Sequence, residues 1–274
     1  MRMNQMKELS REEVQRVETK LLEEFADICE SHGLSYYLAY GTLIGAARHQ
    51  GFIPWDDDVD VMMPRKDFEI LFSEFNGWRL RDTSQFVHCR NETCRFPFAR
   101  IMDTRTLVDE EYSEGGEELG AWIDIFPLDD MPLDADKLFK RIGYWNTARM
   151  LAASDPKKGA TPFARLAKKI LVPCYRRKGA IHYAKKMDRA VLDWDNRDRS
   201  SYAEILGVTE REKPLPKAWF EPALLPFGNR EYCVPACYDE VLSSCYGDWQ
   251  ALPPEEERIP HSVKVFLKEG EALD

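Results

Sequence analysis

The sequence predicts an α/β (α+β) protein in which a mixed sheet is flanked by helices and followed by an additional, mainly helical C-terminal portion. Apolar residues recur at steps of three and four between residues 14 and 28, which is typical of an amphipathic helix. Polar and apolar residues alternate in 58–61 and again in 122–126, which is typical of strands. After about residue 133 the strand-like segments give way to long helical patterns. We therefore divide the 274-residue chain into a core at 1–133 and a mainly helical portion at 134–274, packed on the core as a single compact unit.

The boundaries of the elements carry their own signals. Ser10 and Glu13 form an S-x-x-E capping box at the start of the first helix, and Gly33 fits its end. Pro64 can occupy the first position of a later helix. The same two periodicities predict the remaining elements: strands at 35–40, 58–61, 97–103, 105–111 and 120–128, two or three helices between 134 and 198, and a helix near 238–246.

Composition restricts the class of protein. No stretch approaches ~20 consecutive apolar residues, and the first residues contain no apolar signal-peptide segment, so we expect a cytoplasmic protein whose seven cysteines are reduced. The net charge of −10 argues against nucleic-acid binding. The charge is uneven, however, because residues 157–189 contain eleven Lys/Arg and one Asp.

Carboxylates crowd one short segment: Asp56, Asp57, Asp58 and Asp60 lie within five residues. Like charges this close repel, so the cluster costs stability unless a cation neutralises it. Because side chains alternate along a strand, Asp58 and Asp60 point the same way. Asp124 lies on the second alternating segment, and if the two strands are neighbours the three carboxylates converge. Such a site can hold Mg²⁺ or Mn²⁺ for phosphoryl transfer.

Two alternatives to a metal site are a solvated acidic turn and an EF-hand loop. A solvated acidic turn is the usual role of a charge run, but this run is embedded in apolar, core-forming sequence between Phe52 and Val61. An EF-hand loop would place Asp56, Asp58 and Asp60 at its first, third and fifth positions. It would then need glycine where Val61 stands, so the spacing argues against it.

Further residues around this segment are candidates for binding a phosphorylated ligand. Gly41 and Thr42 lie in a turn whose backbone N–H groups can face phosphates. Arg48, Arg65 and Arg100 are candidate phosphate clamps, because a guanidinium matches phosphate oxygens.

Aromatic residues gather around the same motif. A quaternary ammonium group is recognised by an aromatic cage, and Tyr40, Trp55, Trp122 and Trp249 are the candidates for one. The alternative for each ring is a place in the hydrophobic core.

Four stretches resemble, in the same order, the signature blocks of the LicD family: YYLAYGTLIGAARHQGFIPWDDDVDVMMPRKDFEIL, PFARIMDTRTLVDEE, GAWIDIFPLDDMP and YDEVLSSCYGDWQALPPEEER. The resemblance runs from about residue 10 to 260. It implies a nucleotidyltransferase-like core. Gly41 and Thr42 match the family's Gly-Thr turn, Asp58 and Asp60 its D-x-D metal ligands, and Asp124 the Asp of its W-[IV]-D-[IV]-F-P block.

The resemblance also implies an activity: magnesium-dependent transfer of phosphocholine from CDP-choline to a hydroxyl of a cell-surface glycan precursor, of the teichoic acid or lipopolysaccharide type, with release of CMP. Asp124 is then the candidate general base. Two alternatives stay open. One is a transferase that uses CDP-ribitol or CDP-glycerol, since the chain distantly resembles fukutin-related protein. The other is a non-catalytic nucleotide- or glycan-binding protein of the same fold.

The basic segment at 157–189 adds a hypothesis about location. Leu166 and Ile170 belong to an apolar stripe at helical spacing, with basic residues beside it. A lipid-linked glycan acceptor would favour peripheral contact of this segment with the anionic inner face of a membrane. The alternative is a surface helix whose charges pair with the acidic remainder of the chain.

Overall fold

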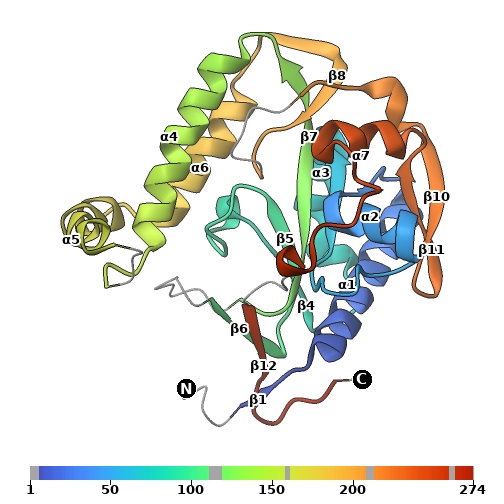
Figure 1. Ribbon diagram of the computed structural model, residues 1–274, viewed down its shortest axis with the longest axis horizontal. Coiled ribbons are helices and arrows are strands. Elements are labelled where there is room, and N and C mark those ends of the chain that lie inside the picture. The colour runs from blue at the N-terminus through green and yellow to red at the C-terminus, as the bar shows by residue number, and fades with distance from the viewer. Residues whose placement is uncertain (1–5, 111–118, 158–160, 208–212, 259–262, 274) are drawn as a thin grey trace.

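The computed structural model describes residues 6–110, 119–157, 161–207, 213–258 and 263–273 (Figure 1). Its main sheet has the strand order β2-β3-β7-β5-β4. In addition, β8 pairs with the second half of β7, and β9 pairs with β8. The strands of this sheet are β2 (Tyr37–Leu38), β3 (Asp60–Pro64), β4 (Ser84–Val87), β5 (Ala99–Asp103), β7 (Trp122–Pro132), β8 (Arg197–Glu204) and β9 (Leu215–Pro216). Within it, β3 and β7 run parallel and the other pairs are antiparallel. The predicted fold class is therefore confirmed.

The long strand β7 organises the molecule. Its first half pairs with β3 on one side and β5 on the other, and its second half pairs with β8. Because β8 and β9 come from the portion after residue 133, that portion contributes strands to the main sheet as well as helices. The division of the chain at this point stays a prediction.

The first helix, α1 (Arg11–His32), has the predicted boundaries. Ser10 accepts a hydrogen bond from the backbone N–H of Glu13, whose side chain bonds back to the Ser10 N–H. Gly33 ends the helix in the left-handed conformation, with φ of 66°, which glycine adopts without strain. The apolar side of α1 is buried together with that of α3 (Arg65–Trp78).

The two faces of β7 have different neighbours. Ile123 and Ile125 point into the core that contains the buried sides of α1 and α3. Phe126 belongs to a second cluster on the opposite face, with Tyr37 and Phe98. Since side chains alternate along a strand, Asp124 shares the face of Phe126, as predicted.

The remaining elements surround this sheet (Figure 1). One group lies beside β2 and consists of α2 (Tyr40–His49), the hairpin of β10 (Pro222–Phe227) and β11 (Arg230–Pro235), and α7 (Tyr238–Tyr246). At the other side stand α4 (Ala135–Ala153) and α6 (Ala180–Leu192), with α5 (Pro162–Arg176) at the edge of the molecule. A small sheet of β1 (Lys7–Glu8), β12 (Val263–Leu267) and β6 (Thr106–Glu110) lies near the chain ends. None of the helices in the described ranges combines the length and apolar character needed to cross a bilayer.

One expectation about the acidic segment is wrong. Asp58 was predicted to lie on a strand with Asp60, but β3 begins at Asp60. The ladder to β7 starts with a bond from the Asp124 N–H to the Val59 carbonyl, so Asp58 lies one residue before the paired region. The carboxylates of residues 56–58 therefore come from the segment that leads into the strand.

Candidate active site

Three charged residues form one row across the sheet. In the parallel pair β3–β7, Asp60 stands opposite Asp124, and in the antiparallel pair β5–β7, Asp124 stands opposite Arg100. The Arg100 Nε donates to Asp124 Oδ1 at 2.6 Å, and the Trp122 indole N–H donates to Oδ2 at 3.1 Å. The condition set in the sequence analysis, that the strands of Asp60 and Asp124 are neighbours, is therefore met, and the sheet adds a cation to the row.

The Gly41–Thr42 turn lies against the same carboxylates. Thr42 Oγ1 accepts a hydrogen bond from the Asp60 backbone N–H at 2.9 Å, which ties the start of α2 to the start of β3. A Cβ atom on Gly41 would stand 2.7 Å from Asp56 Oδ2, so the missing side chain lets the Asp56 carboxylate approach the helix. The match of Gly41 and Thr42 to a family turn therefore coincides with a physical contact to the acidic segment.

Negative charge is concentrated at this site. Burial raises the pKa of Asp60 well above its ordinary value, and the charges of Asp58, Asp124 and Asp56 raise it further. Burial likewise raises the pKa of Glu18 on α1, with added effect from Asp58 and its neighbours. The Glu18 Oε2 atom is buried without a hydrogen-bond partner within the described part of the chain. The carboxylates of this site thus lie close enough to raise one another's pKa.

The donor set fits a hard divalent cation by chemistry, because it consists of carboxylate oxygens on adjacent backbone segments. The side chains of these acidic residues do not converge on one point, however. In the described ranges no three His, Cys, Asp or Glu side chains already stand as a ready set of ligands. The Asp124 carboxylate is instead held by Arg100. A role for Asp58, Asp60 and Asp124 as metal ligands stays a prediction.

Arg100 is enclosed by aromatic rings. Its guanidinium carbon lies 3.8 Å from the centre of the Phe96 ring and 3.9 Å from that of Trp122. Its side chain is only 6% exposed, yet Nη1 is buried without a hydrogen-bond partner among the described residues. One face of Trp122, a candidate for the choline cage, is therefore already covered by a protein cation.

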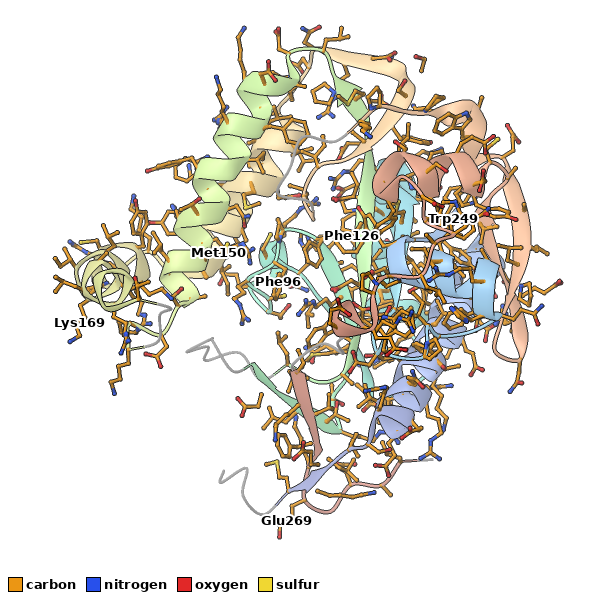
Figure 2. The ribbon with its side chains drawn as sticks, in the orientation of Figure 1. Phe96, Phe126, Met150, Lys169, Trp249 and Glu269 are labelled. Carbon is orange, nitrogen blue, oxygen red and sulfur yellow. The ribbon has the colours of Figure 1, made fainter. Side chains whose placement is uncertain are left out.

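Phe96 gathers further positive charge. The guanidinium carbons of Arg95 and Arg149 lie 5.0 and 5.1 Å from its ring centre, in addition to that of Arg100. Arg149 comes from α4, and Phe96 lies on the side of β7 that faces this helix (Figure 2). Three arginines from two parts of the chain thus surround one ring beside Asp124, an arrangement suited to an anion.

A row of aromatic rings continues from Phe96. Its ring contacts Phe98, Phe98 contacts Phe126, and Phe126 contacts Tyr40. Tyr40 has a φ of 44°, which is strained for a residue with a side chain. The Tyr40 hydroxyl donates to Glu204 at 3.2 Å, and Glu204 is fully buried. A cationic group at the Tyr40 ring would therefore meet a π face whose hydroxyl is bonded to a carboxylate.

Two of the predicted phosphate clamps lie elsewhere. Arg48 Nη1 donates to the backbone carbonyl of Trp249 at 3.0 Å, which fixes the segment after α7. Arg65 lies at the opposite end of β3 from Asp60 and pairs with Asp129 at 2.6 Å. There it borders a cleft of about 340 Å³ whose Lys217 is paired with Asp130. The sheet register separates Arg65 from the acidic cluster, while Arg100 is placed beside it.

Two of the aromatic candidates are also engaged by the protein. The Trp249 indole N–H donates to Asp239 at 2.9 Å, and the residue is buried near α7, away from Phe96 and Phe126 (Figure 2). The ring of Trp55 is faced by the guanidinium of Arg258 at 5.3 Å. Tyr40 contacts the Phe126 ring and donates its hydroxyl to Glu204, and it is the candidate ring in the row that continues from Phe96.

Sequence reasoning missed Glu18, Phe96, Arg149 and Glu204. Glu18 lies in the amphipathic pattern of α1, where a single glutamate among surface charges carries no signal. Arg149 and Glu204 come from portions without a motif. The FPFAR stretch offered the clearest sign, because alternating aromatics precede Arg100.

Comparison with known proteins agrees with this geometry. Residues 33–135 match the family model described as LicD/FKTN/FKRP, nucleotidyltransferase domain. The chain is 27% identical to the lipopolysaccharide cholinephosphotransferase LicD of Haemophilus influenzae over 94% of its own length and 98% of that protein. It is 32% identical to an uncharacterized protein of Rickettsia typhi over 40% of this chain and 37% of that protein. These matches confirm the resemblance to the LicD family, and residues 33–135 are the part that is similar to its nucleotidyltransferase domain.

Proposed function

We propose that this protein transfers phosphocholine from CDP-choline to a hydroxyl group of a cell-surface glycan precursor of the lipopolysaccharide or teichoic acid type. The observation that carries the proposal is the row Asp60–Asp124–Arg100, which stands within a LicD nucleotidyltransferase domain. The full-length similarity to a protein named as a lipopolysaccharide cholinephosphotransferase supports this choice of group and acceptor. The chain is then a transferase.

The reaction forms one bond and breaks one. The acceptor oxygen bonds to the phosphorus that carries choline, and the bond from this phosphorus to the oxygen bridging the two phosphates breaks. CMP leaves with that oxygen, and the acceptor's proton passes to a base. Asp124 is the candidate base, since Arg100 and Trp122 orient both of its oxygens.

A divalent cation, Mg²⁺ or Mn²⁺, would be held by Asp58, Asp60 and Asp124. When bound, it would stabilise negative charge on the phosphoryl oxygens. The raised pKa of Asp60 supports this assignment, because carboxylates that repel one another in a buried site create the demand for a cation.

The arginines around Phe96 would bind the phosphates of the donor. Arg100 has a buried Nη1 that makes no hydrogen bond within the described ranges, and a phosphate oxygen is a fitting acceptor for it. The rings on both sides of Arg100 hold the guanidinium in place before the substrate arrives. Such preorganised charge contributes to the rate because it needs no rearrangement in the transition state.

The choline group would lie against Tyr40, with Phe126 beside it. The Glu204 carboxylate, which accepts a hydrogen bond from the Tyr40 hydroxyl, adds negative potential to the ring. Gly207 lets the backbone pack directly against the Phe126 ring, because a Cβ there would stand 2.4 Å from that ring. A quaternary ammonium at an aromatic face in a desolvated site gains about 2 kcal/mol, whereas the neutral glycerol and ribitol groups of other CDP-alcohols do not.

A donor panel tests the proposal. The purified protein is incubated with CDP-choline, CDP-glycerol or CDP-ribitol, a lipopolysaccharide-type acceptor and Mg²⁺, and CMP release and mass gain of the acceptor are measured. We expect CMP release and a phosphocholine mass gain with CDP-choline, both abolished by EDTA and restored by Mg²⁺ or Mn²⁺. If the protein instead prefers another CDP-alcohol, the transferred group is the phosphate ester of that alcohol and the proposal of phosphocholine is wrong. Donor binding without CMP release in every combination would favour a non-catalytic binding protein.

A further inference from the structure

We propose that α5 is a membrane-docking helix that attaches the protein to an anionic lipid bilayer through an exposed apolar stripe flanked by basic side chains. This rests on the proposed function in one respect: a glycan precursor carried on lipid gives the docking a purpose. The surface itself is defined by α5, by its contacts with α4 and by the charges around both.

The apolar stripe faces away from the protein. Leu166 and Ile170 are 58% and 65% exposed, and Pro173 and Cys174 continue the same side at helical spacing. On the inner side of the helix Val172 is buried. The stripe is thus an unpartnered apolar face within the described part of the chain. Phe163 precedes Leu166 at helical spacing in the sequence, but its side chain lies outside the described residues.

The helix is firmly attached at its inner side. The Arg176 side chain donates to the backbone carbonyls of Ala152 and Ser154 at the end of α4, and Tyr175 packs near Tyr183 of α6. In Figure 1, α5 stands at the edge of the molecule, beyond α4 and on the opposite side from β10 and β11. Its outer face can therefore meet a flat surface without obstruction by the main sheet.

The positive charge around α5 indicates which kind of partner binds this face. Residues 157–189 carry a net charge of +10, while the remainder of the chain carries −20. Within the described ranges, no carboxylate forms an ion pair with Arg165, Lys168, Lys169 or Arg177. The alternative that the basic residues are neutralised by the acidic remainder applies to α6, where Lys185 pairs with Glu92 and Arg189 with Asp193.

An anionic bilayer fits this distribution better than a neutral surface does. Aliphatic side chains can enter the boundary between head groups and acyl chains, and the flanking lysines and arginines can contact the head groups. The acidic remainder would be repelled by the same surface, so attachment through α5 also orients the protein. The helix α4, to which α5 is attached, carries Arg149 at the Phe96 ring. The docked face is therefore separated by one helix from the arginines around Phe96.

Vesicle co-sedimentation tests the proposal with the full chain. Vesicles of phosphatidylcholine with phosphatidylglycerol are compared with vesicles of phosphatidylcholine alone, in about 0.01 M and about 1 M salt, where the Debye length is about 30 and about 3 Å. We expect binding to the anionic vesicles at low salt and its loss at high salt. Equal binding to both lipids, or none to the anionic vesicles at low salt, would overturn the proposal.

Variants then locate the surface. Each basic residue near an anionic surface contributes about fivefold to partitioning, so Lys168→Glu with Lys169→Glu should weaken binding at least about 30-fold. Leu166→Asn with Ile170→Asn should weaken it at least about tenfold, because these side chains are exposed in the free protein and buried in lipid. The matched control is Lys137→Glu with Lys140→Glu, the same charge change at the exposed far end of α4, which should leave partitioning within about twofold.

A further readout separates this proposal from the proposed activity. CMP release with a water-soluble acceptor should be unchanged in both α5 double variants. The assay can therefore show loss of docking with catalysis intact, or docking without catalysis. Unchanged vesicle binding in both variants would refute the role of α5. Sedimentation velocity checks for a second copy as the occupant: self-association that Leu166→Asn with Ile170→Asn abolishes, without lipid binding, would also contradict the proposal.

Discussion

Arg100 is the cation that balances Asp124, and its removal gives a measurable prediction. The two side chains are only 6% and 13% exposed and lie 2.6 Å apart. Arg100→Met keeps most of the volume between the Phe96 and Trp122 rings but leaves Asp124 without its partner. Removing one member of a buried pair costs about 3–5 kcal/mol. Asp58 and Asp60 stand close by, so the remaining charges repel more strongly than before. We expect a loss of at least about 3 kcal/mol in the free energy of unfolding.

Urea denaturation in metal-free buffer measures this loss. The matched control is Arg189→Met, because Arg189 pairs with Asp193 at 2.8 Å but is 74% exposed. Exposed pairs contribute at most about 1 kcal/mol, so the control should be close to the unchanged protein. Added Mg²⁺ should stabilise Arg100→Met more than the unchanged protein, because a bound cation replaces the missing positive charge. Equal effects of the two substitutions would refute the reasoning.

Three further predictions use other parts of the chain. Burial lowers the pKa of His88 from 6.5 to about 4, and both ring nitrogens bond to backbone groups, so the folded state holds the neutral ring. Stability should therefore be full above about pH 7 and fall by about 2 kcal/mol near pH 5, a dependence that His88→Gln removes and His182→Gln keeps. Gly45→Ala should destabilise by more than about 2 kcal/mol in thermal denaturation, because its Cβ would lie 2.4 Å from a backbone carbonyl oxygen, whereas Gly77→Ala, with open space around it, should be neutral or stabilising. Tyr40→Leu should raise the KM for CDP-choline roughly thirtyfold while Tyr40→Phe, which keeps the ring, stays near normal; equal KM values would remove Tyr40 from the choline site.

Much of the site could be predicted because it is encoded locally. The alternation of polar and apolar residues in 122–126 predicted that Asp124 lies on the same face of the sheet as Phe126. The acidic run before β3 predicted a cation-binding site. That Asp60 and Asp124 face each other depends on parallel pairing of β3 with β7, which the sequence pattern allowed but did not require. The helix boundaries at Ser10 and Gly33 were equally predictable, since the signals are the capping groups themselves.

Residues brought in by tertiary pairing escaped prediction. Arg65 and Arg100 were equally good candidates from the sequence. Arg65, however, follows the end of β3 that is opposite to Asp60, whereas Arg100 lies on β5 opposite Asp124. Arg149 and Glu204 reach the site only because α4 and β8 return to β7 from later in the chain. Such placements follow from sheet order and register, which one sequence does not specify.

The turnover of Asp60→Asn tests the central claim most directly. The substitution keeps the side-chain shape and the backbone bond to Thr42 while removing the buried charge. We predict that turnover of CDP-choline falls roughly 10²-fold or more, because a key electrostatic stabiliser is lost. The free energy of unfolding should not fall, since repulsion among the carboxylates is relieved. Asp193→Asn, an exposed control, should keep full turnover. Near-normal turnover in folded Asp60→Asn would contradict the assignment of this carboxylate cluster as the catalytic centre.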